Sequence, residues 1–331
     1  MHIFIDESGT FALSERATSV SAVGALVIPT GRLPYFERLY SRLRPSLSKH
    51  NGEVKGRLLD EAQIGQVVAL LRRVGAFFEV VAIDMGLHDQ EAILGHKKKQ
   101  EHAVTGYLTE EHHPNVVAGV WDLRRRLEEM PLQLYVQATA QTALIYDVLG
   151  HAQLYFAVRA FRELGMFNWV IDAKGKGGTV PWEQWWQTAV LPMIESQSLR
   201  KPFPAVIEGN YTAMKRFQRE PSEYKLQFSG GDHSSSTWFD LRLAMMESMR
   251  FSDVAEPGLE AVDILTNAIR RSLAGNLSRS GWIPISRIMI NRHRHAIRLI
   301  SLNDAEVDGS RLPYAPVVRD FNRCGISMFP K

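Results

Sequence analysis

Three short apolar runs in this 331-residue chain each end on an aspartate. The runs are His2–Ile5, Ala76–Ile83 and Phe167–Ile171, and the aspartates that follow them are Asp6, Asp84 and Asp172. Short runs rich in β-branched and aromatic residues that stop at a polar residue are typical of buried strands. In open α/β sheets, functional side chains gather at the carboxyl ends of such strands. The pattern therefore predicts an α/β fold with an acidic edge.

Further segments predict helices and strands around this framework. Val20–Ile28 is β-branched and is closed by Pro29, so it predicts a second strand that forms an antiparallel hairpin with the first. Asp60 and Gln63 form a capping box before an apolar helical stripe. The other predicted elements are helices at Arg32–Leu47 and Gly258–Leu273 and short strands at Ala205–Ile207, Tyr224–Phe228 and Met249–Phe251. Alternating strands and helices indicate a mixed sheet flanked by helices.

The segment 97–165 has a different texture. It contains long helical stretches, including Val120–Glu129 and Ala138–Leu164, and no convincing strand. No Gly/Ser-rich linker flanks it, which favours a helical insertion over an independent domain. We expect one core from residues 1–96 and 166–303, this insertion, and a C-terminal extension at 304–331 packed on the core. The insertion is a candidate surface for a protein partner or for a second copy of the chain.

Composition indicates where the protein is located, but it says little about what the protein binds. A single cysteine, Cys324, excludes an intramolecular disulfide framework and favours a reducing compartment. No apolar run approaches the roughly 18 residues that a membrane span needs, and the N-terminus shows no signal-peptide core. We therefore expect a soluble cytoplasmic protein with no membrane association. The formal net charge of +3 is too small to indicate a partner.

Arginines cluster near the C-terminal end of the chain. Seven lie between Ile264 and Asn303 without an intervening acid: Arg270, Arg271, Arg279, Arg287, Arg292, Arg294 and Arg298. Arginine suits bidentate contact with phosphate, so Arg270, Arg271, Arg292 and Arg294 are candidate nucleic-acid contacts. A solvated basic face paired with acids elsewhere explains the pattern equally well.

A third aspartate belongs with Asp6 and Asp172. Asp263 adjoins the apolar face of the predicted helix Gly258–Leu273, so its carboxylate needs a partner or a metal ion, and Glu260 lies one turn earlier. An ion pair with an arginine is the alternative. Converging carboxylates repel one another unless a cation neutralises them, and such oxygen ligands suit Mg²⁺ or Mn²⁺. Two ions of this kind activate a water and stabilise the leaving oxygen of a phosphodiester.

The order of these motifs resembles the ribonuclease H-like family catalogued as domain of unknown function 3800. The motifs that carry the resemblance are Phe4-Ile-Asp-Glu-Ser-Gly9, Gly24-Ala-Leu-Val-Ile28, Glu53-Val-Lys55-Gly, Val170-Ile-Asp172, Gly258-Leu-Glu-Ala-Val-Asp263-Ile-Leu and Ala268-Ile-Arg-Arg271. The family's usual last motif has glutamine at the position of Glu260 and two small residues at Thr266-Asn267. These departures leave Asp263 in register, whereas segments 97–165 and 181–247 match nothing in the family.

The resemblance implies a ribonuclease H-like fold with an acidic metal site. It makes Asp6, Asp172 and Asp263 the expected catalytic and metal-binding residues, and it implies an association with mobile elements or antiviral defence.

Several residues are candidates for supporting roles in this site. Glu7 is expected to face the other side of the sheet, since successive strand residues alternate, although it could turn inward at the strand end. Glu53 competes with Asp84 as a fourth acid and is preferred because it lies in a recognisable motif. Lys55 and Lys174 are candidate phosphate contacts, or ordinary surface lysines.

Two function classes follow from these features. The first is a metal-dependent nuclease that hydrolyses phosphodiester bonds in DNA or RNA. The second is a catalytically silent ribonuclease H-like module that binds nucleic acid or a protein. A phosphatase with Asp6 as nucleophile needs a second aspartate two residues later, where Ser8 stands. A serine hydrolase built on Ser8 lacks the small residue two positions before the serine.

Overall fold

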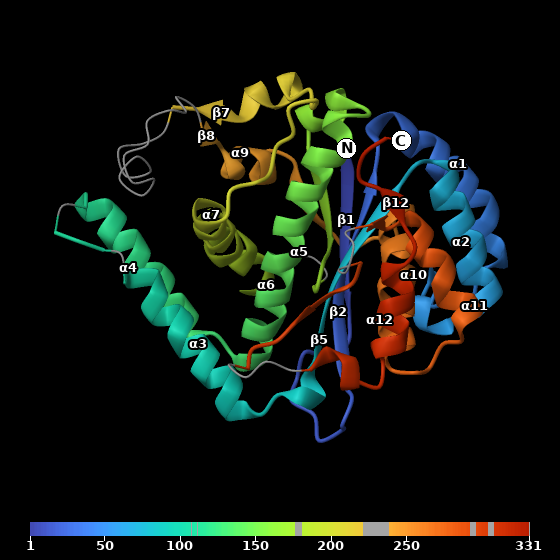
Figure 1. Ribbon diagram of the computed structural model, residues 1–331, viewed down its shortest axis with the longest axis horizontal. Coiled ribbons are helices and arrows are strands. Elements are labelled where there is room, and N and C mark those ends of the chain that lie inside the picture. The colour runs from blue at the N-terminus through green and yellow to red at the C-terminus, as the bar shows by residue number, and fades with distance from the viewer. Residues whose placement is uncertain are drawn as a thin grey trace.

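The computed structural model describes residues 1–106, 108–110, 112–175, 181–220, 238–291, 296–303 and 308–330. A six-stranded mixed sheet runs through its centre in the order β11-β5-β2-β1-β6-β9 (Figure 1). Its strands are β1 His2–Ser8, β2 Val20–Ile28, β5 Phe77–Asp84, β6 Asn168–Asp172, β9 Met249–Ser252 and β11 Arg298–Ile300. β1 and β5 both pair antiparallel with β2, whereas the β1–β6, β6–β9 and β5–β11 pairs are parallel. The α/β prediction and its opening hairpin are confirmed.

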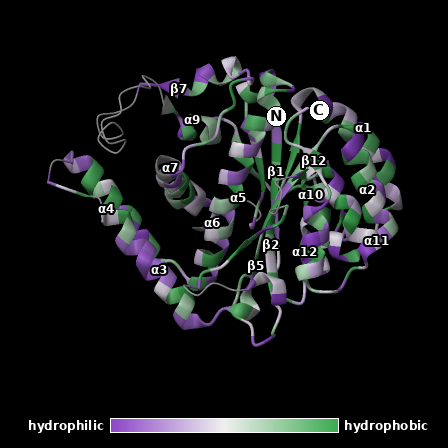
Figure 2. Cartoon of the chain, in the orientation of Figure 1, coloured by the Kyte–Doolittle hydropathy of each residue, from purple (hydrophilic) through white to green (hydrophobic). Residues whose placement is uncertain are grey.

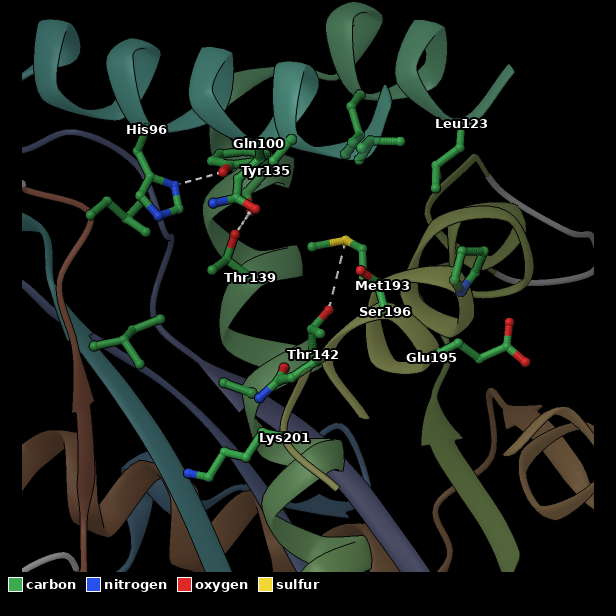
Figure 3. Close-up of a pocket in the computed structure, with 18 of the residues that line it drawn as sticks. His96, Gln100, Leu123, Tyr135, Thr139, Thr142, Met193, Glu195, Ser196 and Lys201 are labelled. Atoms are coloured by element: carbon green, nitrogen blue, oxygen red, sulfur yellow. Dashed lines mark hydrogen bonds between the residues drawn. The ribbon is translucent and has the colours of Figure 1, made fainter. Parts of the chain in front are cut away.

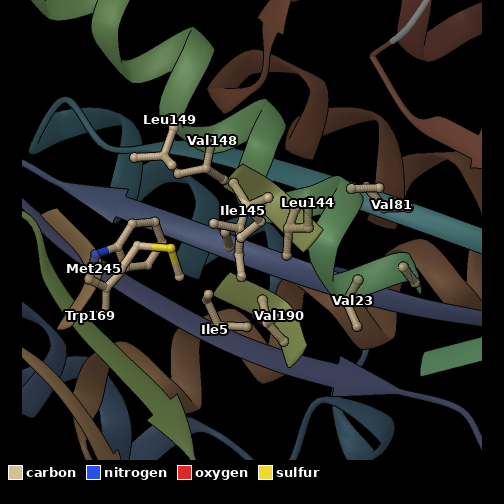
Figure 4. Packing of buried hydrophobic residues seen from close by; sticks show 14 of the residues in the cluster. Ile5, Val23, Val81, Leu144, Ile145, Val148, Leu149, Trp169, Val190 and Met245 are labelled. Atoms are coloured by element: carbon tan, nitrogen blue, oxygen red, sulfur yellow. The ribbon is translucent and has the colours of Figure 1, made fainter. Parts of the chain in front are cut away.

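Helices cover both faces of the sheet, because each strand alternates apolar side chains between two buried clusters. One face packs against α1 Leu33–Leu43, α2 Glu61–Arg73 and α10 Pro257–Leu273, with α11 Arg279–Trp282 and α12 Ala315–Asn322 beyond them (Figure 1). The other face packs against α5 Leu132–Ala157, α7 Leu191–Arg200, α9 Leu241–Met246 and the helix formed by α6 Pro181–Trp185 and the π-turn Trp186–Val190. Figure 4 shows Leu144, Ile145 and Val148 of α5 over Ile5 and Val23 of the sheet.

Two helix predictions are confirmed, and one of them is corrected in length. The capping box is present: the Asp60 side chain accepts from the Gln63 backbone N–H, and α2 follows. The helix predicted at Arg32–Leu47 ends at Leu43, because Pro45 follows and the chain continues as a 3-10 turn.

The strand predicted at Ala205–Ile207 is wrong: this segment is a loop in which the Val206 N–H donates to the Tyr211 hydroxyl at 2.9 Å. The strand predicted at Tyr224–Phe228 lies outside the described residues.

The helical segment begins earlier than the sequence indicates. α3 spans Gln90–Thr105 and is capped by the Asp89 side chain, so residue 97 falls inside a helix. α4 spans Pro114–Glu129, and with α3 it forms an arm at one side of the molecule (Figure 1). α5 is different because most of its residues are buried against the sheet. In Figure 2 the hydrophobic residues concentrate on the sheet and on the inner sides of the helices. Thus α3 and α4 project from the body, and α5 belongs to the core.

The remaining elements are short. The C-terminal residues pack on the core through Phe321 of α12, whose ring is stacked on Trp282 at 5.1 Å between centroids. The small strand pairs are β3 Lys49–His50 with β4 Glu53–Val54, β7 Gln218–Arg219 with β8 Trp238–Phe239, and β10 Ile290–Asn291 with β12 Ile326–Ser327. Within the described ranges, no helix combines the length and apolar character needed to cross a membrane.

Candidate active site

The strand register places Asp6 beside Asp172. The parallel pairing of β1 with β6 runs up to Ile5 opposite Ile171, and the next residue on each strand is the aspartate. Neighbouring strands lie about 4.8 Å apart, so the two carboxylates leave the sheet close together. Asp6 is 7% exposed, and the Glu7 N–H donates to its Oδ1 at 2.7 Å.

Both aspartates face α10. Phe4 and Val170, two residues before them on the same strands, belong to the buried cluster that includes the inner face of α10. Since side chains alternate along a strand, Asp6 and Asp172 point to that side, and Glu7 points to the side covered by α5. The sheet thus divides the acids of the first motif between its two faces.

Two glycines let α10 and its neighbours approach closely enough to bring Asp263 to this edge. At Gly258 an added Cβ would lie 2.4 Å from the Phe4 ring, so the helix passes directly over β1. At Gly56 an added Cβ would lie 2.7 Å from the Ile264 Cα. This second contact lets the Gly56 N–H donate to Asp263 Oδ2 at 2.8 Å. The backbone therefore holds the Asp263 carboxylate in place.

The three aspartates influence one another electrostatically. Burial raises the pKa of Asp6 well above its usual range, and the charges of Asp263 and Asp172 raise it further. Burial raises the pKa of Asp172 to about 6, an effect that the charge of Lys55 opposes and that of Asp263 reinforces. Burial also raises the pKa of Asp263, against the hydrogen bond from Gly56. Three carboxyl groups from β1, β6 and α10 thus share one site in which negative charge is incompletely compensated.

Two lysines stand beside these acids. Lys55 pairs with Glu53 at 2.7 Å, and its charge lowers the pKa of the aspartates. Lys174 forms a close ion pair with Glu7, and its Nζ lies 3.8 Å from an oxygen of Asp172. Burial lowers the pKa of Lys174, while the charges of Asp6 and Asp263 raise it. Both lysines predicted as supporting residues therefore lie at the acidic edge.

Two other predicted acids are occupied by structural contacts. Glu260 is 5% exposed and accepts a bidentate pair of hydrogen bonds from Arg44, each 2.8 Å long, and a third from the Val54 N–H at 2.9 Å. Asp84 Oδ1 accepts from the backbone N–H groups of Ser19 at 2.7 Å and Gly86 at 3.0 Å. Glu260 and Asp84 therefore order the surrounding backbone.

The arginines predicted to contact nucleic acid also differ in what they contact. Arg270 donates from Nε to Ser8 Oγ at 2.8 Å, and Asn267 donates to the same oxygen at 3.1 Å. Arg271 instead donates to the backbone carbonyls of Leu59 at 2.8 Å and Gly56 at 3.3 Å, so it fixes the turn that holds Asp263. Arg292 and Arg294 lie outside the described residues.

Sequence reasoning missed the contacts of Ser8, Asn267 and Arg44. Ser8 and Asn267 lie within motifs that the sequence singles out, but as neighbours of the aspartates rather than as residues with a role. Arg44 carries no local signal, because its partner Glu260 is 216 positions away in sequence.

The three carboxylates are chemically suited to a divalent cation, because carboxylate oxygens are hard ligands. Asp6, Asp172 and Asp263 are the residues that would hold it. In the part of the chain that the structure describes, no three acidic, histidine or cysteine side chains are arranged closely enough to hold an ion. Searches of protein-family models, curated proteins and solved structures return no match to this chain.

Proposed function

We propose that this protein is a metal-dependent nuclease whose acidic site consists of Asp6, Asp172 and Asp263. The observation that carries the proposal is their convergence from β1, β6 and α10 at one sheet edge, where burial raises all three pKa values and the charge of Asp263 raises those of Asp6 and Asp172 further. Perturbed carboxyl groups of this kind cluster at functional sites. A bound divalent cation would relieve that repulsion.

The order of the strands supports the same proposal. An antiparallel set, β5-β2-β1, is continued by the parallel strands β6 and β9. An antiparallel hairpin followed by parallel crossings is the order expected of a ribonuclease H-like sheet. The motifs that resemble the domain of unknown function 3800 family lie on this sheet, on α10 and in the segment Glu53–Gly56. We therefore propose a ribonuclease H-like fold, with a role in defence or mobile-element biology as the corresponding biological setting.

The chain's own residues have distinct parts in the proposed chemistry. When bound, Mg²⁺ or Mn²⁺ would supply an activated water and charge stabilisation for the leaving oxygen. The Gly56 N–H and the turn held by Arg271 keep Asp263 in position. Lys174 and Lys55 offset the negative charge of the acids. A bound cation would replace part of the charge compensation that the Lys174 ammonium provides. Arg270, which is half-buried and feels the charge of Asp263, would contact a phosphate.

The test is cleavage of single- and double-stranded DNA and RNA, and of a hybrid, in Mg²⁺ or Mn²⁺. We expect cleavage of at least one of these substrates and its loss, by at least about 100-fold, in Asp6→Ala/Asp263→Ala, since direct ligands should matter more than the outer-shell partners of a metal. Glu37→Gln, an exposed acid on α1, is the matched control and should leave the rate unchanged. Cleavage that survives in the double variant would contradict the site assignment.

A second candidate function is a silent module that binds nucleic acid or protein. It is favoured by the ion pairs Glu53–Lys55 and Glu7–Lys174, which offset charge without a metal. Binding of Mg²⁺ or Mn²⁺ separates the two functions and needs no substrate. The nuclease should gain thermal stability with either ion, and Asp6→Ala/Asp263→Ala should not. Absence of both metal binding and cleavage would favour the silent module.

A further inference from the structure

A cavity of about 550 Å³ lies on the opposite side of the sheet from most of the acidic site. It is enclosed by the arm of α3 and α4, by α5 and α7, and by the end of β11 and the residues after it (Figure 3). None of the aspartates or lysines of the acidic site lines it. Its volume falls within the range of roughly 300–1,000 Å³ that small-molecule sites occupy.

The walls of this cavity are mainly apolar and come from separate segments. Val104 is on α3, Val120 and Leu123 are on α4, Met193 is on α7, and Ile300 is on β11. Apolar atoms that line a cavity make dispersion contacts with an apolar molecule that enters it. The arm therefore gains contact with the body if an apolar molecule fills the space.

Three side chains along one stripe of α5 carry hydroxyl groups that line the cavity, and each hydroxyl group already has a hydrogen-bond partner. The Tyr135 hydroxyl is 2.7 Å from Nδ1 of His96, and Thr139 Oγ1 donates to the Tyr135 carbonyl at 2.9 Å. Thr142 Oγ1 donates to the sulfur of Met193 at 3.9 Å. Because these groups are already partnered, an apolar chain can lie against them without leaving a buried donor unsatisfied.

Two cationic residues lie at one end of the cavity, and one of them, Lys201, is exposed. Lys201 and Arg298 line it there, and the Lys201 carbonyl accepts from the Tyr146 hydroxyl on α5. Arg298 pairs with Asp147 at 2.9 Å. Within the described residues, no carboxylate pairs with the Lys201 ammonium.

The acid that lines the cavity stands apart from this end. Glu195 is on α7, and Figure 3 shows its carboxylate directed away from Lys201. Along α5 the lining residues run from Tyr135 to Ala143, which corresponds to roughly 12 Å at 1.5 Å per residue. The space is thus elongated, apolar along its length and cationic at one end.

From these features we infer that the cavity binds an elongated amphiphilic monoanion. Its apolar chain lies between the arm and α5, and its carboxylate meets Lys201. Such a ligand joins the arm to the body of the protein. This site is independent of the acidic site and of the proposed nuclease activity.

Isothermal titration calorimetry of the full chain with decanoate tests the inference. Decanol and decyltrimethylammonium serve as neutral and cationic probes of the same chain length. We expect one decanoate per protein, bound at least tenfold more tightly than either of the other probes. Absence of decanoate binding would overturn the site, and equal affinity for the three probes would overturn the anionic class.

Two variants with matched controls locate the binding. Ala103→Trp fills the cavity from α3 and should abolish decanoate binding, whereas Ala118→Trp on the exposed side of α4 should not. Lys201→Gln should weaken decanoate binding at least fivefold and leave decanol unchanged, whereas Lys98→Gln on exposed α3 should change neither. Circular dichroism verifies that each variant is folded. Decanoate binding that survives in folded Ala103→Trp would overturn the proposed location.

Discussion

The acidic edge and the cavity differ in how they treat polar groups, although both adjoin the same sheet. At the edge, Asp6, Asp172 and Asp263 are brought together with incomplete compensation, and their pKa values rise. In the cavity, the hydroxyl groups of α5 are partnered and most of the remaining lining is apolar. Native proteins retain unfavourable charge where function requires it and remove it elsewhere. The contrast agrees with the reactive site that we propose at the edge and the binding site that we propose in the cavity.

The same contrast appears within α10 over a single turn. Glu260 has three hydrogen bonds from Arg44 and the Val54 N–H, whereas Asp263 has one, from the Gly56 N–H. Glu260 therefore stabilises the fold, and Asp263 keeps acceptor capacity available for a ligand. Substitutions at these two positions should separate stability from function.

The largest stability effect is expected at Glu260. Glu260→Ala removes the partner of the Arg44 guanidinium and leaves the buried Val54 N–H unsatisfied. We expect a loss of about 3 kcal/mol in the free energy of unfolding, because Arg44 is partly exposed and water replaces some of the pairing. Urea denaturation measures the loss. Asp263→Asn keeps an acceptor for the Gly56 N–H and should be no less stable than the parent protein; an equal loss in both variants would contradict the distinction.

A smaller loss is expected when the turn is pushed away from α10. In Gly56→Ala the new Cβ would lie 2.7 Å from the Ile264 Cα and 2.8 Å from the Asp263 carbonyl oxygen. Both are backbone atoms, so the turn must shift, at a cost of about 2 kcal/mol. Gly65→Ala is the control, because its Cβ would meet nothing within 4 Å and a helical alanine should stabilise α2. Thermal unfolding of the two variants should move in opposite directions.

On the other side of the sheet, one polar side chain departs from the pattern of the cavity. Gln141 on α5 is fully buried, and neither its amide nitrogen nor its oxygen has a hydrogen-bond partner among the described residues. Gln141→Leu has nearly the same volume and removes this desolvated amide, so it should stabilise the protein by about 1.5 kcal/mol. A fall in the midpoint of urea unfolding would instead show that the amide is bound by water or by another group.

The smallest effect is expected at Asp172 and depends on pH. Because burial raises its pKa to about 6, the folded state holds a proton there more tightly than the unfolded state. The ionised carboxylate therefore reduces stability above about pH 6, and the penalty disappears as pH falls to the unfolded value near 4.

Asp172→Asn should consequently stabilise the protein at pH 7 by about 1 kcal/mol, a figure discounted for solvent screening because this side chain is 41% exposed. Unfolding measured at pH 7 and pH 4 checks the prediction. A gain of the same size at both values would assign the effect to packing rather than to charge.

Much of this arrangement could be read from the chain itself. The strands that carry Asp6 and Asp172 are predicted by short β-branched runs, although β1 continues past Asp6 to Ser8, and the helix carrying Asp263 is predicted by its apolar periodicity. Alternation along β1 predicts the separate directions of Asp6 and Glu7. These signals are local, because each depends on residues within one element.

Tertiary structure decided the rest, because the relevant contacts join residues far apart in sequence. Glu260 resembled a site residue until Arg44, 216 positions away, was found to occupy it. Segment 97–165 had the texture of an insertion, but the packing of α5 made part of it core. The cavity has no sequence signature, since its lining comes from helices and a strand that meet only when the chain is folded. By itself the sequence determined which residues are acidic or apolar and which segments form helices. Long-range packing determined which of these residues contact one another.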